Sequence, residues 1–207
     1  MNSYLITFTL LSLLLLALSP NQSLASSSRN YKDDTNAFSV PRYSRYVKDA
    51  CNVTRYQQLC LRTLWPFTIV AKNNSSKWAR AGVAVTITDT KRILRLLLKA
   101  RNSSAVGKRE RIALSDCREL FVDSLDNLYK SLSVLRNLDA DEFQQQMSDL
   151  ATWLSAALTD EDTCLDGFEE TMSKSLTVRM IKRKATRSMH LCSNALALTN
   201  KLAYDGL

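Results

Sequence analysis

Cysteine and histidine are the residue types in this chain that most readily carry out chemistry. The 207 residues include five cysteines and one histidine, His190. A single histidine argues against a histidine-based metal centre and against a Ser-His-Asp triad. No C-x-x-C, G-x-S-x-G, P-loop, G-x-G-x-x-G or H-E-x-x-H motif is present. We therefore expect no enzyme activity, no cofactor and no metal site.

The cysteines instead predict two disulfide bonds, provided that the protein is exported. Cys51 and Cys60 are nine positions apart, whereas Cys117 and Cys164 fall near the apolar faces of two successive predicted helices. Four cysteines allow three pairings, and the pairing of sequence neighbours favours Cys51–Cys60 and Cys117–Cys164. Cys192 lies on the apolar stripe of the last helix, so we expect a buried free thiol there.

The N-terminal residues predict export. Residues 10–18 are apolar apart from one serine, a run too short to span a bilayer but typical of a secretory signal peptide. Small residues follow at 23 and 25, so we expect residues 1–25 to be cleaved before Ser26 and no membrane contact afterwards. An uncleaved anchor is the alternative. Residues 26–40 are polar and aperiodic, which predicts a flexible tail.

Glycosylation sequons also support export, because Asn-X-Ser/Thr triplets are glycosylated in exported proteins. The four acceptor positions are Asn52, Asn73, Asn74 and Asn102.

The elements that must position these residues are predicted to be helices. With four glycines and three prolines, and no proline after Pro66, the chain cannot supply the many turns of a β-sandwich. The 45% apolar content supports a packed core. We expect a domain over 41–207, with a helical hairpin at 41–70 and a four-helix bundle at 75–205.

The four bundle helices are placed by apolar stripes and by their ends. We expect them at about 75–101, 108–135, from Asp139 onwards, and 175–202. Asp139, with Glu142 three positions later, is typical of a helix cap. Gly167 lies in an acidic segment, where we expect the third helix to distort or end. Four amphipathic helices with short connections predict an all-α antiparallel bundle.

Two exposed surfaces of this bundle are candidates for binding another protein. An acidic ridge lies opposite the apolar stripe of the second helix and consists of Asp116, Glu119, Asp123 and Asp126. A hydroxyl row follows the outer face of the third helix and consists of Ser148, Thr152, Ser155, Thr159 and Thr163. Short hydroxyl side chains let another backbone approach closely. The alternative is that both faces are ordinary solvated surfaces.

Basic residues gather on the first and fourth helices, and the net charge is +8. No aromatic residues are interleaved with them, which argues against nucleic-acid binding. In an exported protein such faces are better suited to an acidic polysaccharide, or they are simply solvated.

Two segments resemble the plant pectin methylesterase/invertase inhibitor family. The first is Ala113-Leu114-Ser115-Asp116-Cys117-x-Glu119 with Asp123, Asp126 and Leu128, and the second is the stretch from Thr152 to Cys164. The resemblance covers roughly residues 40–203. It implies a four-helix bundle preceded by a helical hairpin, with disulfides Cys51–Cys60 and Cys117–Cys164. It also implies an extracellular protein of the apoplast or cell wall.

The family resemblance further implies an inhibitor that forms a 1:1 complex with pectin methylesterase and covers its substrate cleft. The expected interface consists of Glu119, Asp123, Asp126, Thr152, Ser155, Thr159 and Asp162. Two alternatives remain. One is inhibition of cell-wall or vacuolar acid invertase by the same fold, and the other is a wall-binding structural protein that uses its basic faces.

Overall fold

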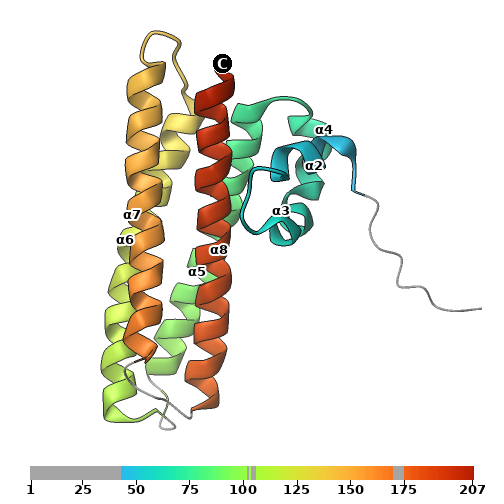
Figure 1. Ribbon diagram of the computed structural model, residues 1–207. Helices are drawn as coiled ribbons and strands as arrows, with labels where there is room; N and C mark the ends of the chain where they lie inside the picture. The colour runs from blue at the N-terminus through green and yellow to red at the C-terminus, as the bar shows by residue number, and fades with distance from the viewer. Residues whose placement is uncertain (1–42, 102, 104–105, 170–174) are drawn as a thin grey trace, which may run out of the picture. The chain divides into compact units, whose positions relative to one another are not determined.

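The protein is an antiparallel bundle of four long helices with a group of short helices packed against one side (Figure 1). The computed structural model describes residues 43–101, 103, 106–169 and 175–207. The long helices are α5 (Ser75–Arg101), α6 (Lys108–Arg136), α7 (Phe143–Glu169) and α8 (Leu176–Asp205). Each packs on the next, and α8 closes the ring against α5. The predicted fold class is confirmed, whereas the signal peptide and tail at 1–40 lie outside the described residues.

Apolar residues at helical spacing explain why these segments form a bundle. On α6, Leu114, Phe121, Leu128 and Leu135 recur every seven residues, and all are buried. Residues seven apart lie on one face of an α-helix, so a single stripe of α6 reaches the core along its whole length. The predicted stripe on α6 is therefore confirmed.

The third helix differs from its prediction at its start. It begins at Phe143 rather than near Asp139, because the Asp139 carboxylate accepts the backbone N–H of Asp141 (2.8 Å) and closes a local turn. Asp139 N–H in turn donates to the Gln146 side chain (3.0 Å). At the other end the helix passes Gly167, buries Phe168 beyond it and runs to Glu169, which lies within the acidic segment 160–172 where an end was expected.

A polar layer divides the core of the bundle into two apolar clusters. The layer takes one residue from each long helix: Thr90, Ser124, Glu161 and Ser188, all fully buried. The three hydroxyls donate to the same oxygen, Glu161 Oε1, over 3.1, 3.0 and 3.2 Å. Burial raises the pKa of Glu161 to about 8, although the hydroxyls partly stabilise its charge. The layer therefore holds all four helices at one level.

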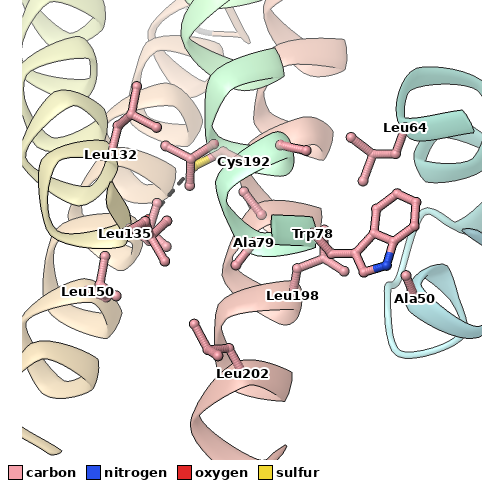
Figure 2. Close-up of a cluster of buried hydrophobic side chains, with 14 of the residues drawn as sticks. Ala50, Leu64, Trp78, Ala79, Leu132, Leu135, Leu150, Cys192, Leu198 and Leu202 are labelled. Atoms are coloured by element: carbon pink, nitrogen blue, oxygen red, sulfur yellow. Dashed lines mark hydrogen bonds between the residues drawn. The ribbon is translucent and has the colours of Figure 1, made fainter. Parts of the chain in front are cut away.

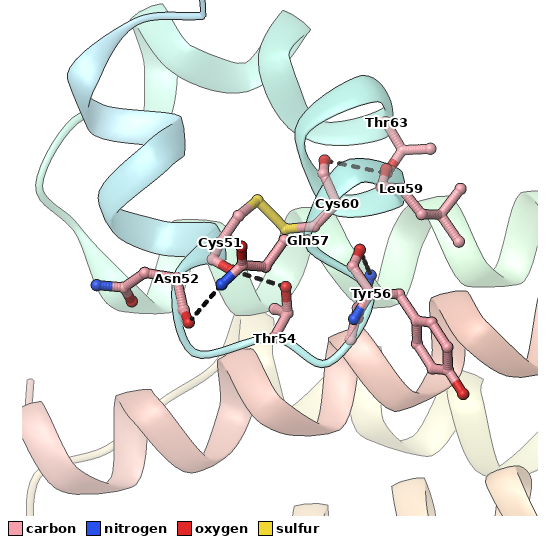
Figure 3. Close-up of a disulfide and its surroundings, with 9 residues drawn as sticks. Cys51, Asn52, Thr54, Tyr56, Gln57, Leu59, Cys60 and Thr63 are labelled. Carbon is pink, nitrogen blue, oxygen red and sulfur yellow. Dashed lines mark hydrogen bonds between the residues drawn. A yellow bond between two sulfur atoms is a disulfide. The ribbon is translucent and has the colours of Figure 1, made fainter. Parts of the chain in front are cut away.

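The hairpin consists of α2 (Arg45–Cys51) and α3 (Gln57–Leu64), followed by η1 (Trp65–Phe67) and α4 (Thr68–Ala71). The expected Cys51–Cys60 disulfide joins its two helices (Figure 3). Inside the turn, the Thr54 hydroxyl donates to the Cys51 carbonyl (2.7 Å), and the Gln57 amide donates to the Asn52 carbonyl (3.1 Å). The turn is thus held by a covalent bond and by two side-chain hydrogen bonds, in addition to the backbone bond from Thr54 N–H to the Cys51 carbonyl.

Apolar side chains pack the hairpin onto the bundle (Figure 2). Trp78 of α5 is buried and belongs to the same cluster as Ala50 and Leu64 of the hairpin. Its indole N–H donates to the Lys72 carbonyl (2.8 Å), so the ring is both packed and hydrogen-bonded. Cys192 of α8 lies in the same cluster as a buried free thiol, as expected.

A polar clamp fixes the hairpin turn to α8. The buried Asn194 side chain accepts the Tyr56 backbone N–H (3.1 Å) and donates to the Tyr56 carbonyl (3.0 Å). The Tyr56 ring stacks on His190 with 3.6 Å between ring centroids. Burial, and to a lesser extent the Arg55 cation, lowers the pKa of His190. The one histidine of the chain is thus used to hold the hairpin.

We expect Asn194→Leu to destabilise the protein by about 2 kcal/mol, because both backbone groups of Tyr56 lose their partner. Thermal unfolding measures the loss, and amide hydrogen exchange at Tyr56 should accelerate. Asn194→Asp should also lose stability, because its buried carboxylate cannot donate to the Tyr56 carbonyl. Asn200→Leu is the matched control, because Asn200 is exposed on the same helix. Unchanged exchange at Tyr56 in Asn194→Leu would show that the clamp does not hold the turn.

Candidate functional site

The acidic ridge of α6 is exposed to solvent. Glu119, Asp123 and Asp126 point away from the buried stripe, as the helical periodicity predicts. Among the ion pairs of the described residues, none involves these three carboxylates. Their charge is therefore available to a partner that approaches from solvent.

The hydroxyl row of α7 is exposed too, but several of its hydroxyls are already engaged. The Thr152, Thr159 and Thr163 hydroxyls each donate to the carbonyl four residues earlier, over 3.0, 3.0 and 2.8 Å. Such bonds use the hydroxyl hydrogen and leave the oxygen lone pairs and the methyl group facing out. This face of α7 is thus a surface of small groups that accepts hydrogen bonds more readily than it donates them.

The two surfaces meet along a seam between α6 and α7. Asp160 of α7 lies against Asp123 and Asn127 of α6. Burial, and then repulsion from the Asp123 carboxylate, raises the pKa of Asp160, whereas a hydrogen bond from Asn127 works against this rise. The seam therefore concentrates negative charge whose amount depends on pH.

A groove of about 390 Å³ continues this seam at the end where the Cys117–Cys164 disulfide crosses it. The disulfide itself lines the groove, together with Asp116 of the acidic ridge and Thr163 of the hydroxyl row. Apolar and polar groups thus alternate along one shallow depression. Such a depression suits a segment of a protein partner better than a small metabolite.

The structure does not bring all seven expected interface residues to this seam. Thr159 lies about 100° around the α7 axis from Asp160, and Ser155 and Asp162 lie farther round, at about 140° and 160°. Both are exposed, so they face solvent on the flank of α7 away from α6. Thr152 is also exposed and lies about 80° from Asp160.

Asp160 and Asn127 belong to the seam, although the sequence did not single them out as interface residues. The signal was present for Asn127, which follows Asp123 by one helical turn. It was obscured for Asp160, because the run Asp160-Glu161-Asp162 resembles a solvated surface although its members face three different directions. The packing of α6 on α7 decides which of them reaches the seam.

The remaining expected positions are surface features. Asn52, Asn73 and Asn74 are exposed, whereas Asn102 lies outside the described residues. Among the described residues, no group of histidine, cysteine or acidic side chains could hold a metal ion. Nor does any helix of that part of the chain have the length and apolar character needed to cross a membrane.

Comparisons with known proteins give one family. The model of the plant invertase/pectin methylesterase inhibitor family matches residues 45–198. Pectinesterase inhibitor 6 of Arabidopsis thaliana is 75% identical over 185 residues, which are 89% of this chain and 87% of that protein. Pectinesterase inhibitor 3 of the same plant is 37% identical over 75% of this chain and 78% of its own length. A crystal structure of a mutant pectin methylesterase inhibitor from Arabidopsis superposes with a TM-score of 0.61 at 22% identity, over 76% of this chain and 97% of that one.

Proposed function

The chain belongs to the plant invertase/pectin methylesterase inhibitor family, and we propose that it inhibits a plant pectin methylesterase. It is a member of an inhibitor family rather than an enzyme. The observation that carries the proposal is the 75% identity to a protein named pectinesterase inhibitor over nearly the whole chain. The relatives found include several other pectinesterase inhibitors, so acid invertase is not favoured as the target.

We propose that inhibition occurs through a 1:1 complex in which the α6–α7 face covers the substrate cleft of the esterase. The proposal is supported by the exposed acidic ridge, by the row of small hydroxyl residues and by the groove along the seam. The carboxylates would pair with cations at the rim of the cleft, and the small residues would allow the backbones to approach. The disulfide and the polar layer hold both helices in place, so little order has to be gained on binding.

We further propose that the protein acts outside the cell, in the apoplast or cell wall. Support comes from the predicted signal peptide at 1–25, from the two disulfides and from the exposed acceptor residues Asn52, Asn73 and Asn74. Mass spectrometry of the protein secreted by plant cells tests cleavage before Ser26 and the occupancy of each sequon.

The decisive experiment is a titration of purified plant pectin methylesterase, and in parallel acid invertase, with the chain that lacks residues 1–25. We expect esterase activity to be lost near equimolar protein while invertase remains active. Light scattering after gel filtration should then give the mass of a 1:1 complex. Inhibition of invertase alone would move the chain to the other branch of its family, and no inhibition of any plant esterase would refute the proposal.

Charge reversal on the acidic ridge of α6 tests whether this ridge contacts the esterase. We expect Asp123→Lys with Asp126→Lys to raise the concentration for half inhibition at least about tenfold, because two favourable charge contacts become repulsive. Asp49→Lys with Asp141→Lys is the matched control, since both residues are exposed and lie outside the α6–α7 seam. Circular dichroism confirms that each variant is folded. Equal inhibition by both double variants would place the interface elsewhere on the molecule.

A further inference from the structure

A basic groove lies on the opposite side of the bundle from the α6–α7 face. The long helices contact one another in the cyclic order α5, α6, α7, α8, so α5 and α8 form the side remote from the α6–α7 seam. This groove, of about 500 Å³, is lined by Arg92, Arg95, Leu96, Leu98, Lys99 and Lys184. No carboxylate occurs among the described residues that line it.

Arg92, at one end of this groove, and the neighbouring Arg187 of α8 both contact one buried carboxylate. Asp89 is buried and forms an ion pair with Arg187 of α8 and a longer contact with Arg92 (3.7 Å). Asp89, Arg92 and Arg187 also line a second depression of about 290 Å³, which reaches Thr63 and Phe67 near the hairpin. The two depressions therefore meet at Arg92, and the Asp89 carboxylate compensates the charge at this end of the groove.

The remaining cations form a row along the groove. Arg95 and Lys99 are exposed one helical turn apart on α5, about 6 Å along the axis, and Lys184 faces them from α8. Among the ion pairs of the described residues, none involves these three side chains. Between them Leu96 and Leu98 contribute apolar surface, and Leu98 is exposed. The groove thus combines spaced positive charges with an apolar floor.

We propose that this groove binds de-esterified pectin, a linear polysaccharide with a carboxylate on each uronic acid unit. Spaced cations match a polymer with repeated carboxylates, and an arginine fork can pair with a carboxylate through two hydrogen bonds. The leucines offer the apolar contact that the C–H faces of sugar rings require. The described residues that line the groove include no aromatic side chain, which disfavours stacked nucleotide bases.

The inference rests on the proposed function, because pectin methylesterase converts neutral methyl esters of this polymer into carboxylates. With the polysaccharide on the α5–α8 side and the enzyme on the α6–α7 side, one molecule of the inhibitor could hold both. The inhibitor would then accumulate where the esterase has already acted, so the product of the enzyme would recruit its inhibitor. Methyl-esterified pectin, which lacks the charges, would not retain it.

Direct binding of the secreted chain to polysaccharide tests the proposal without any esterase. The probes are polygalacturonate, highly methyl-esterified pectin and single-stranded DNA, each at about 0.15 M salt. The groove variant is Arg95→Glu, Lys99→Glu and Lys184→Glu. The matched control, Lys48→Glu, Arg62→Glu and Lys77→Glu, makes the same change in net charge at exposed positions that do not line the groove.

We expect the native chain to bind polygalacturonate and not the esterified pectin, and the groove variant to bind at least about tenfold more weakly than the control. Equal losses in both variants would show that net charge alone is responsible and would overturn the proposal, as would tighter binding to DNA. Inhibition of esterase by the native chain and by the groove variant is assayed separately. A native chain that inhibits normally but does not bind polygalacturonate rejects only this inference, and a native chain that binds polygalacturonate without inhibiting rejects only the proposed function.

Discussion

The folded protein should lose on the order of 5 kcal/mol of stability as the pH rises from about 4.5 to about 8, because Glu161 keeps its proton in the fold. Below this interval the carboxyl is protonated in both states, so the full stability is present. Within it, the unfolded chain releases the proton while the fold retains it, and stability falls by about 1.4 kcal/mol per pH unit. Above pH 8 the loss is complete.

The geometry of the polar layer explains why the proton is retained. All three hydroxyls of the layer donate to Glu161 Oε1, whereas Oε2 is buried without a hydrogen-bond partner among the described residues. An ionised carboxylate there would leave one charged oxygen unsolvated, with the Asp89 carboxylate adding repulsion. Protonation removes this cost and leaves the three hydrogen bonds to Oε1 in place.

Glu161→Gln separates this effect from the other titrating groups. The amide is neutral at every pH and keeps an oxygen for the three hydroxyls, so we expect a nearly flat stability between pH 5 and 8. The variant should therefore be more stable than the native chain at pH 8 and close to it at pH 4.5. Glu119→Gln is the matched control, because Glu119 is exposed on α6 and its removal should leave the native slope unchanged.

Urea unfolding at pH 4.5, 6 and 8 measures the free energy of unfolding of the native chain, Glu161→Gln and Glu119→Gln. His190 acts in the opposite direction, since a lowered pKa makes its folded state prefer the neutral form and so favours stability at higher pH. Asp160 acts in the same direction as Glu161, because its pKa is raised. A slope in Glu161→Gln as steep as in the native chain would assign the pH dependence to such groups and reject the role of Glu161.

The sequence was sufficient to predict the bundle but not the polar layer. The apolar stripes placed the long helices to within a few residues, apart from the start of α7, because each helix buries one face along most of its length. The same stripes contain the layer, since Thr90 lies between Ile87 and Ile93, and Glu161 follows Ala157 at the spacing of buried residues. In the sequence of one helix, a single polar residue on an apolar stripe does not show whether it has a partner on another helix.

The role of the four polar-layer residues becomes clear only from how the four helices are aligned along the bundle axis. The polar residue of each stripe lies at the level where the other three stripes are also interrupted, so the four can satisfy one another. Helical periodicity fixes the direction of a side chain but not its height relative to a neighbouring helix. We infer that the layer favours this alignment, because any shift of one helix would bury an unpaired polar group.

The Cys117–Cys164 disulfide should contribute about 4 kcal/mol to stability, more than the Cys51–Cys60 disulfide. Its cysteines are 47 positions apart, against nine for the hairpin disulfide. A longer closed loop removes more conformational entropy from the unfolded chain, and the chain-entropy relation gives about 4 kcal/mol for the first and about 2.7 kcal/mol for the second. We therefore expect Cys117→Ala with Cys164→Ala to lower the urea midpoint more than Cys51→Ala with Cys60→Ala.

The two disulfides should also differ in their effect on inhibition. Cys117 and Cys164 line the groove along the α6–α7 seam, so their loss should loosen the proposed interface and weaken esterase inhibition even at temperatures where the protein stays folded. The Cys51–Cys60 disulfide lies in the hairpin, and its loss should spare that face. Cys192→Ala is the control for thiol chemistry, because Cys192 is buried and unpaired. Equal losses of stability from the two double variants would contradict the loop-length argument, and normal inhibition by Cys117→Ala with Cys164→Ala would show that the interface does not depend on this bridge.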